Sequence, residues 1–530
     1  MSILLLAKKT NPIILLAIPL IISSFTHIWN PIGFPPFFVD EGHYMRRTLQ
    51  VLNGLGPQES ISVYDYPYDH PYFGQLFLAG LLWVTGYPGS QVSDSSELKN
   101  SIEILHSTPR IIMGILAVVD TLLLFKIAEL IYNRNVAFIA SLLFAVMPIS
   151  WMFRMILLDT LLMPFLLLSI FLLLYYRNRV TKSDRAEETN KRSFLLVILS
   201  GIFFGLAVFT KESAVFMLPL LLYLMLSTKS STGPPVKRPR LLATWFVPVT
   251  FFLLLWPAIA LLQHQFDNWI HGVLYQVVRE DKELSATLQS LFTIDPILMI
   301  LTVIALVLTS KKEYMFLIWI VPYLLFLAIL GANVRYFHFV PLVPAFCILA
   351  ANLLINFSQK IKRKIIPYII VLSIFIIGIV STSLLVSVNL TTIYFNLYTF
   401  IVKALPSHEN DANNAVTMIG SHWMRNFFWI PQYILNKNLI FKDADPILFH
   451  GTHPSEKIMF LVTRNLYSKI RDNKLNDEYT QQLRSISYNS SLIGSFKENW
   501  TALAYPHTYP YNVFDTLLGS LGKVDVRTNY

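Results

Sequence analysis

Long apolar segments alternate with short polar ones along most of the chain. Each apolar segment is long enough to cross a hydrocarbon core of roughly 30 Å as a helix, which predicts transmembrane spans. The segments lie near residues 12–29, 110–131, 135–153, 156–176, 193–209, 213–228, 241–262, 295–310, 314–331, 336–356 and 365–388. A shorter segment at 75–88 contains Gly80, Gly86 and Pro88. Its length favours a juxtamembrane or re-entrant helix.

The basic residues between these segments predict the orientation of the chain. If Lys8 and Lys9 are inside and 75–88 does not cross, every dense basic cluster falls on the inner side, as the positive-inside rule requires. The clusters are Lys126 and Arg134, Arg177 to Arg192, Lys229 to Arg240, Lys311 and Lys312, and Lys360 to Lys364. The pattern predicts about eleven spans, an uncleaved first helix, and a tail outside.

The C-terminal tail differs from the rest of the chain. Strand-like runs at 415–419 and 457–462 alternate with helix-like runs at 424–435 and 476–486, which predicts a small extracytoplasmic α/β domain. We therefore expect a transmembrane domain at 1–388, with a first external loop at 30–108, and a second domain at 389–530. Glycosylation sequons at Asn389, Asn489 and Asn499 suit an external tail, but Asn356 carries one on the predicted inner side.

Composition agrees with a membrane location. The mean hydropathy is +0.53 and 14% of the residues are charged, against roughly a quarter in soluble domains. The net charge of +10 comes from the inner clusters, so it does not indicate a nucleic-acid partner. The single cysteine, Cys347, excludes an intrachain disulfide and a cysteine-based zinc site. We expect an integral protein of the cell membrane or, in a eukaryote, of the endoplasmic reticulum.

Charged residues on the predicted outer side are the candidates for chemistry, because charge near a span is costly and therefore a functional hypothesis. They come from separate turns: Asp40, Glu41, Asp69, His70, Arg154, Asp159, Lys211, Glu212 and Arg335. Taken singly, each has a structural interpretation as a helix cap, a snorkelling charge or an ion pair. Together they suit a lipid phosphate, which cations neutralise, and a carboxylate base that takes a proton from a hydroxyl.

The segments that carry these charges follow one another in a particular order. They are Val39-Asp40-Glu41-Gly42-His43-Tyr44, Asp69-His70-Pro71-Tyr72-Phe73-Gly74-Gln75-Leu76, Pro109-Arg110-Ile111, Arg154-Met155-Ile156-Leu157-Leu158-Asp159-Thr160, Gly205-Leu206-Ala207-Val208-Phe209-Thr210-Lys211-Glu212, and Arg335-Tyr336-Phe337 with Pro341 and Pro344. This order resembles the protein O-mannosyltransferase family and its prokaryotic relatives, among them the lipid A aminoarabinose transferases. All are GT-C glycosyltransferases that use lipid-phosphate sugars. The tail lacks the β-trefoil repeats of the eukaryotic enzymes, so a prokaryotic-type member is expected.

The resemblance covers about residues 10–390 and implies roles for individual residues. Asp40 is the expected catalytic base, with Glu41 beside it. The phosphate of the donor is expected to contact Lys211, Arg335 and Arg154. Site-shaping roles fall to Asp159, Asp69, His70 and Tyr336. Tyr72-Phe73 stands where the family has Pro-Leu and Gln75 where the mannosyltransferases have a lysine, and these departures leave the acceptor open.

The leading hypothesis is an inverting glycosyltransferase that moves a sugar, most commonly mannose in this family, from a polyprenyl-phosphate donor. The acceptor hydroxyl belongs to a protein Ser or Thr, a lipid or a glycan. An oligosaccharyltransferase would call for Asp-x-Asp in the first loop and Trp-Trp-Asp-x-Gly in the tail; the tail has no such motif, and Asp40-Glu41 is not Asp-x-Asp. A lipid-linked sugar flippase would favour internal repeats, and none is visible. No cofactor or metal is predicted, although Glu41, Asp69 and His70 leave a divalent ion open.

Overall fold

The computed structural model of the chain describes residues 11–56, 68–89, 97–182, 188–227, 238–277, 284–308, 313–330, 334–361, 365–405, 415–421, 424, 428–444, 449, 451–452, 456–472, 477–497, 509–510 and 523–530. It forms two compact units. The first, here the membrane unit, comprises residues 1–31, 57–78 and 110–386, and the second, the mixed unit, comprises 32–56, 79–109 and 387–530. The predicted boundary at 388 lies beside one of these divisions. The first external loop contributes to both units, which was not predicted.

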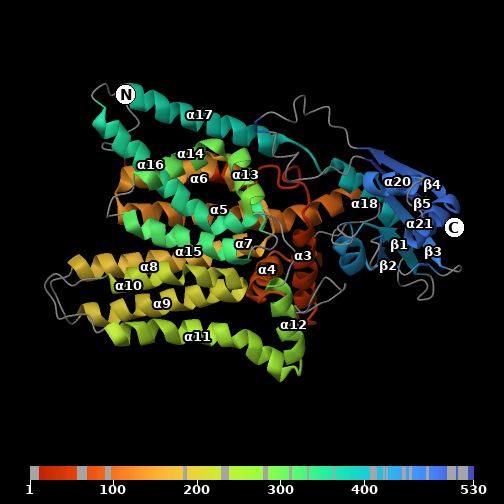
Figure 1. Ribbon diagram of the computed structural model, residues 1–530, viewed down its shortest axis with the longest axis horizontal. Helices are drawn as coiled ribbons and strands as arrows, with labels where there is room; N and C mark the ends of the chain where they lie inside the picture. The colour runs from red at the N-terminus through yellow and green to blue at the C-terminus, as the bar shows by residue number, and fades with distance from the viewer. Residues whose placement is uncertain are drawn as a thin grey trace. The chain divides into compact units, whose positions relative to one another are not determined.

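The membrane unit consists of helices (Figure 1). In chain order these are α2 (Pro12–Ile28), α4 (Phe73–Val84, as far as Leu78), α5 (Leu98–Ile131, from Arg110), α6 (Arg134–Val146), η3 (Pro148–Arg154), α7 (Leu158–Leu161), α8 (Met163–Lys182), α9 (Glu188–Thr210), η4 (Glu212–Met217), α10 (Leu218–Leu226), α11 (Arg238–Leu262), α12 (Phe266–Val277), α13 (Leu284–Ile294), α14 (Pro296–Val307), α15 (Tyr314–Leu330), η6 (Tyr336–Leu342), α16 (Val343–Lys360) and α17 (Ile365–Ser387).

Five helices in the described part of the chain are long and apolar enough to cross a membrane, or seven if two bent pairs each form one span. The shorter apolar helices Pro12–Ile28, Phe194–Thr210, Glu212–Leu226 and Tyr314–Ile329 lie on other predicted spans. The polytopic helical fold is thereby confirmed, while the count of eleven stays a prediction. Helix α4 has 12 residues, in keeping with the short segment that was expected not to cross.

Close helix packing in the membrane unit depends on small residues. Helices α8, α9 and α11 run side by side (Figure 1). A Cβ atom on Gly201 of α9 would lie 2.5 Å from the carbonyl oxygen of Trp245 on α11, so only glycine permits this approach. The hydroxyl groups of Ser169 and Ser200 lie 2.9 Å apart, and the Trp245 indole donates to Ser200 at 3.2 Å. These bonds satisfy buried polar groups between helices.

Two helices of the membrane unit are broken where proline follows an apolar run. Helix α6 meets η3 at 71° just before Pro148, and α13 meets α14 at 117° at Asp295. The Asp295 carboxylate caps α14 by accepting from the backbone N–H of Leu298 at 3.0 Å, and it also accepts from that of Ile149 at 3.3 Å. One buried side chain thus satisfies backbone donors at both breaks.

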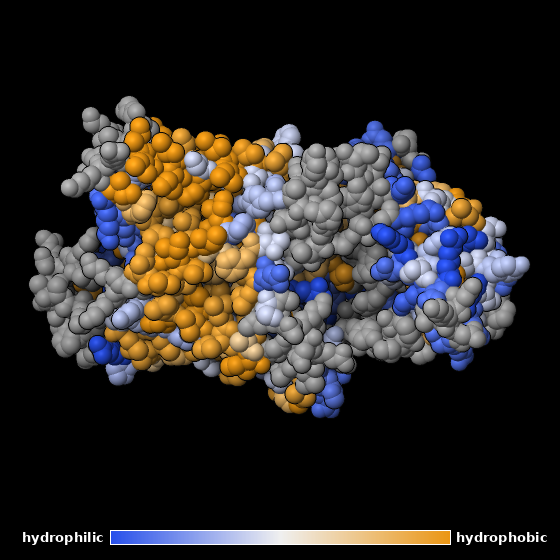
Figure 2. All heavy atoms as spheres, turned by 45° about the horizontal axis from the view of Figure 1, so that its top comes forward, coloured by the Kyte–Doolittle hydropathy of each residue, from blue (hydrophilic) through white to orange (hydrophobic). Residues whose placement is uncertain are grey.

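The exposed surface of the helices in the membrane unit is apolar. Figure 2 shows hydrophobic side chains gathered into a broad continuous face. Large apolar side chains on α11 and α17 are exposed, among them Val247, Phe251, Ile369 and Ile376. An apolar face of this extent would be unstable in water, so it is suited to lipid.

The mixed unit contains a five-stranded sheet of order β2-β1-β3-β5-β4. Its strands are β1 (Val416–Gly420), β2 (Leu439–Asp443), β3 (Lys457–Thr463), β4 (Ser491–Lys497) and β5 (Lys523–Thr528), and its helices include α3 (Val39–Leu52), α18 (Thr392–Ala404), α20 (Arg464–Arg471) and α21 (Glu478–Tyr488). Strands β1, β2 and β3 are parallel, whereas β5 pairs antiparallel with β3 and β4. The small C-terminal α/β domain is confirmed, with predicted strands at β1 and β3 and a predicted helix at α21. The run predicted as a helix at 424–435 contains a π-helix at Ile430–Ile434.

Candidate functional site

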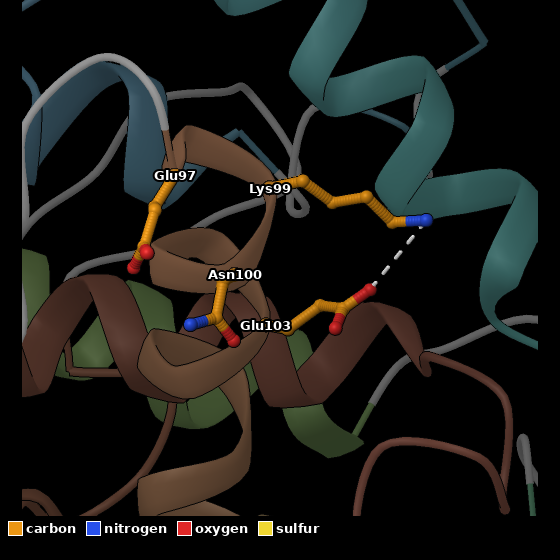
Figure 3. A pocket seen from close by; sticks show the side chains of 4 residues that line it. All are labelled: Glu97, Lys99, Asn100 and Glu103. Atoms are coloured by element: carbon orange, nitrogen blue, oxygen red, sulfur yellow. Dashed lines mark ion pairs between the residues drawn. The ribbon is translucent and has the colours of Figure 1, made fainter.

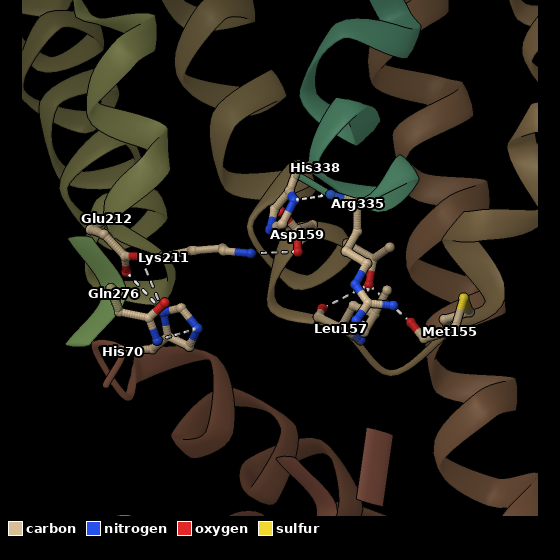
Figure 4. A network of polar contacts seen from close by, with 10 residues as sticks. His70, Met155, Leu157, Asp159, Lys211, Glu212, Gln276, Arg335 and His338 are labelled. Atoms are coloured by element: carbon tan, nitrogen blue, oxygen red, sulfur yellow. Dashed lines mark hydrogen bonds and ion pairs between the residues drawn. The ribbon is translucent and has the colours of Figure 1, made fainter. Parts of the chain in front are cut away.

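A buried ion pair joins two breaks in the helices of the membrane unit (Figure 4). Asp159 lies in the first turn of α7, and Lys211 precedes η4, where α9 ends. The Lys211 Nζ atom lies 2.7 Å from Asp159 Oδ2, and the two side chains are 5% and 1% exposed. Extended backbone at Leu157 and at Lys211 turns the chain out of helix at both places and brings the side chains together.

In the described residues, the ion pair is surrounded by buried groups that leave one carboxylate oxygen of Asp159 unpaired and place an aromatic ring near Lys211. Within the described part of the chain, Asp159 Oδ1 is buried and has no hydrogen-bond partner. Lys211 Nζ lies 5.8 Å from the centroid of the Phe337 ring. Removing either partner of a buried pair is strongly destabilising because the other charge remains desolvated. The ion pair is therefore expected to be important for the stability of the membrane unit.

A second polar cluster adjoins the first through Glu212, the residue after Lys211. His70 Nδ1 lies 3.1 Å from both Glu212 carboxylate oxygens, and His70 Nε2 lies 3.4 Å from the Gln276 side-chain nitrogen (Figure 4). The His70 side chain is 9% exposed and that of Glu212 is 41% exposed. Gln276 was not predicted as a site residue, because nothing in the local sequence of α12 distinguishes it.

Arg335 lies at the start of η6, on the same side of the membrane unit as the 155–159 segment (Figure 4). Its backbone N–H donates to His338 Nδ1 at 2.9 Å, and its side chain is exposed. Tyr336 is buried against Trp151, with ring centroids 5.6 Å apart. The exposed Arg335 side chain points toward Met155 and Leu157, in the segment that leads to Asp159 (Figure 4).

Arg154 has a different environment from the other predicted phosphate contacts. It is buried, and its guanidinium donates to the backbone carbonyls of Trp29 and Asn30. Arg110 donates in the same way to the carbonyl of Pro31 at 3.1 Å. These two arginines fix the chain where it leaves the first span. Arg154 therefore has a structural role. Its contact with the donor phosphate is still a prediction.

The acidic pair belongs to the mixed unit and begins α3. Asp40 and Glu41 occupy the first turn of this helix, where the helix dipole favours negative charge. Glu41 is buried, and its carboxylate accepts from the backbone N–H of Phe38 at 3.0 Å. The capping interpretation therefore applies to Glu41. Asp40 is half-buried, so one predicted acid serves the fold while the other remains accessible.

Aromatic side chains cover the chain on either side of Asp69 and His70, both of which are buried. Tyr68 and Tyr72 pack with Phe209 of α9 and Trp256 of α11. The Tyr68 hydroxyl donates to Gln263 at 2.6 Å. Burial raises the pKa of both phenols, and for Tyr72 the neighbouring Tyr68 adds to the effect, so neither titrates near neutral pH. The cluster holds the residues before α4 in place without adding charge.

A surface hollow of about 490 Å³ lies in the mixed unit at the start of α5 (Figure 3). It is lined by Glu97, Lys99, Asn100 and Glu103, and Lys99 pairs with Glu103 at 3.8 Å. These residues are largely exposed and are not among the predicted site residues. Among the residues that the structure describes, no group of three or more His, Cys, Asp or Glu side chains could hold a metal ion.

Comparison with known proteins identifies the fold. Residues 63–276 match the model of the dolichyl-phosphate-mannose-protein mannosyltransferase family. ArnT from Cupriavidus metallidurans bound to undecaprenyl phosphate is similar over 98% of this chain and 98% of that chain, with a TM-score of 0.52 and 12% identity. This chain has the GT-C fold. The resemblance predicted from the order of the motifs is thus confirmed, as is an integral membrane protein.

Other proteins with the GT-C fold are oligosaccharyltransferases. The Archaeoglobus fulgidus enzyme tethered with an acceptor peptide is similar over 88% of this chain and 70% of its own, with a TM-score of 0.55 and 13% identity. AglB from the same organism, in complex with an inhibitory peptide and a dolichol-phosphate, is similar over 83% of this chain and 65% of its own, with a TM-score of 0.51 and 15% identity. No curated protein matches the sequence significantly.

Proposed function

We propose that this GT-C protein transfers a sugar from a polyprenyl-phosphate donor to a hydroxyl acceptor on the non-cytoplasmic face of the membrane. The observation that carries the proposal is the buried Lys211–Asp159 pair, with Arg335 exposed at the neighbouring break. A cation that is fixed by a buried carboxylate is preorganised for an anionic ligand, since the side chain is already in place when negative charge develops on that ligand.

The phosphate of the donor is the proposed ligand of these cations. When the bond between the sugar and the phosphate breaks, negative charge grows on the phosphate, and Lys211 and Arg335 stabilise that charge. Arg154 holds the adjoining backbone and is the third proposed contact. Undecaprenyl phosphate in ArnT and dolichol-phosphate in AglB are ligands of the same chemical class in proteins of the same fold, which supports this assignment.

Asp40 is the proposed base. Its carboxylate takes the proton of the acceptor hydroxyl while the hydroxyl oxygen bonds to the anomeric carbon. The bond between the anomeric carbon and the phosphate oxygen breaks, and its electron pair leaves with the phosphate. A single displacement of this kind inverts the anomeric centre. The half-buried position of Asp40 at the start of α3 supports the role, because the carboxylate is accessible and its neighbour Glu41 already satisfies the cap.

The donor sugar is proposed to be mannose, from the match of residues 63–276 to the mannosyltransferase family. The acceptor class remains a protein Ser or Thr, a lipid or a glycan. No metal is required by the proposed steps. The outer side follows from the basic clusters, which the positive-inside rule places in the cytoplasm.

The proposal is tested with purified protein and a panel of radiolabelled polyprenyl-phosphate sugars, beginning with mannose, with the native membrane fraction as the source of acceptor. Transfer of label into a product supports the proposal, and the chemical nature of that product names the acceptor. If no member of the panel is used by folded protein, the transferase assignment is wrong. Movement of label across vesicles without transfer would then indicate a flippase.

A further inference from the structure

The segment that leads into α3 is held by aromatic contacts with distant parts of the mixed unit. Phe37, which lies three residues before Asp40, packs against His106 of α5, with ring centroids 4.7 Å apart. Two residues of α18 contact the same phenyl ring, Tyr394 at 5.1 Å and Phe395 at 5.4 Å. All of these residues belong to the mixed unit. The residues before α3 therefore pack against α5 and against the first helix of the tail.

His106 is the centre of a buried group of aromatic side chains. Its ring centroid lies 4.9 Å from that of Trp429, 5.3 Å from that of Phe395 and 5.9 Å from that of Tyr398. His106 Nδ1 is 3.1 Å from the carbonyl oxygen of Ile102, one turn earlier in α5. A carbonyl oxygen only accepts, so Nδ1 donates, and this bond fixes the plane of the imidazole. The loop–tail cluster comprises Phe37, His106, Tyr394, Phe395, Tyr398 and Trp429.

The aromatic contacts continue from the loop–tail cluster into the sheet of the tail. Tyr398 packs edge-on against Phe428 at 5.4 Å, and Phe428 packs against Phe441 of β2 at 5.8 Å. The backbone provides a second link, because the Leu390 N–H donates to the Gly33 carbonyl at 2.9 Å. The first external loop is thus joined to the tail through side chains and through the backbone.

We propose that the loop–tail cluster is a positioning device, through which the C-terminal tail holds the proposed base, Asp40, in place for proton abstraction. This inference rests on the proposed function and deepens it. Asp40 lies in the first turn of α3, so a displacement of Phe37 moves its carboxylate. A base must be within hydrogen-bond reach of the proton that it takes, and a misplacement of about 1 Å can lower a rate roughly 100-fold. His106 and Trp429 act through Phe37, so they are positioning residues.

The first test compares kcat and donor KM, with polyprenyl-phosphate mannose or with whichever panel sugar the wild type uses. Trp429→Leu should lower kcat about tenfold or more, because the base is displaced. Its donor KM should stay near that of the wild type, since the proposed donor contacts Lys211 and Arg335 belong to the membrane unit. Trp429→Phe keeps an aromatic ring against His106 and should retain most of the wild-type kcat.

Phe460→Leu is the matched control. Phe460 is a buried aromatic residue of β3, in a separate hydrophobic core that includes residues of α20 and α21. Its replacement should weaken the tail as Trp429→Leu does, because both remove a buried aromatic side chain, but it should leave kcat near that of the wild type. If Phe460→Leu lowers kcat as much as Trp429→Leu, the tail acts only through its stability and the inference is wrong.

The second test does not depend on sugar transfer. In a Cys347→Ser background, the reaction of Asp40→Cys with a maleimide measures how often the start of α3 leaves its place. Adding Trp429→Leu should accelerate this reaction about fivefold, the size expected for loss of one aromatic contact, whereas adding Phe460→Leu should not. Equal labelling rates in all three proteins would overturn the inference. If the wild type transfers no sugar, the proposed function fails, and the labelling rates decide separately whether the tail holds the start of α3.

Discussion

Lys211 and Asp159 show how a single contact links stability to the proposed chemistry. Both side chains are almost fully buried, and their 2.7 Å separation makes each the necessary partner of the other. A pair in this environment contributes little net stability compared with apolar residues, but breaking it leaves one charge desolvated. In the proposed mechanism, the same burial holds the ammonium in place for the donor phosphate.

The first prediction concerns the Asp159 carboxylate. Asp159→Ala should destabilise the protein by about 3–5 kcal/mol, because the Lys211 ammonium would remain buried without a partner. Thermal unfolding in detergent measures the effect. The double variant Asp159→Ala with Lys211→Met should recover part of the loss, and a double variant as unstable as the single one would contradict the argument.

The second prediction concerns the donor. Lys211→Ala should raise the donor KM about tenfold or more, because a charge-assisted hydrogen bond contributes roughly 1.5–3 kcal/mol. Lys126→Ala, at a surface ion pair on α5, serves as the control and should leave donor use unchanged. Equal apparent donor affinity in the wild type and Lys211→Ala would remove Lys211 from the phosphate site.

At the residue scale, sequence identified the charges but not their partners. Lys211, Asp159 and His70 were chosen because charge at the end of a span is expensive. The pairing of His70 with Glu212 and the burial of Arg154 on carbonyls depend on contacts between residues 124 to 206 positions apart, including Gln276. Single-sequence reasoning has no access to such contacts, so a carbonyl-bound arginine and a phosphate-bound one look alike.

The stability of individual helices in the membrane unit depends on whether the backbone N–H groups at their ends find hydrogen-bond acceptors. The break between α13 and α14 exposes backbone donors inside an apolar environment, where an unsatisfied N–H is costly. Asp295 is fully buried and accepts from Leu298 and Ile149 at once. It thereby ties α14 to η3, the segment that leads to Arg154.

The third prediction follows from this cap. Asp295→Ala should destabilise the protein by about 1–2 kcal/mol or more, which is the usual loss on removing an N-cap acceptor. Asp295→Asn keeps an acceptor oxygen in the same place and should be clearly milder. Both are compared by thermal unfolding in one detergent. If Asn is as damaging as Ala, the capping bond is not the source of the stability.

Elements were predicted well where periodicity is strong. The apolar segments became helices, and the runs at 415–419 and 457–462 became β1 and β3. The break before Pro148 was missed because the apolar run at 135–153 looks continuous in composition. The segment expected at 295–310 matches α14, whereas α13 before it was not predicted. The pairing of β5 with both β3 and β4 was also beyond sequence reasoning, since partner choice depends on residues far apart in the chain.

For the molecule as a whole, the basic clusters predict that the tail lies on the non-cytoplasmic side of the membrane, and this side is still a prediction. Arg238 and Arg240 are exposed at the start of α11, on the predicted inner side, whereas Tyr488 is exposed at the end of α21 in the tail. The native Cys347 is buried on α16, so it should not compete for a thiol reagent.

The fourth prediction uses this contrast. In a Cys347→Ser background, Tyr488→Cys should react with a membrane-impermeant maleimide in intact cells or sealed vesicles of known orientation. Arg238→Cys should react only after permeabilisation. The reverse pattern would place the tail in the cytoplasm and would overturn the proposed side of transfer.

The most direct test of the central claim compares sugar transfer by the wild type and by Asp40→Asn, with radiolabelled polyprenyl-phosphate mannose and the native membrane fraction. The account predicts label in a product with the wild type and a loss of at least about 100-fold in Asp40→Asn, since removing a general base has effects of this size. Folding and donor binding should stay near normal, because Glu41 rather than Asp40 makes the capping bond. Near-normal turnover by Asp40→Asn would contradict the account.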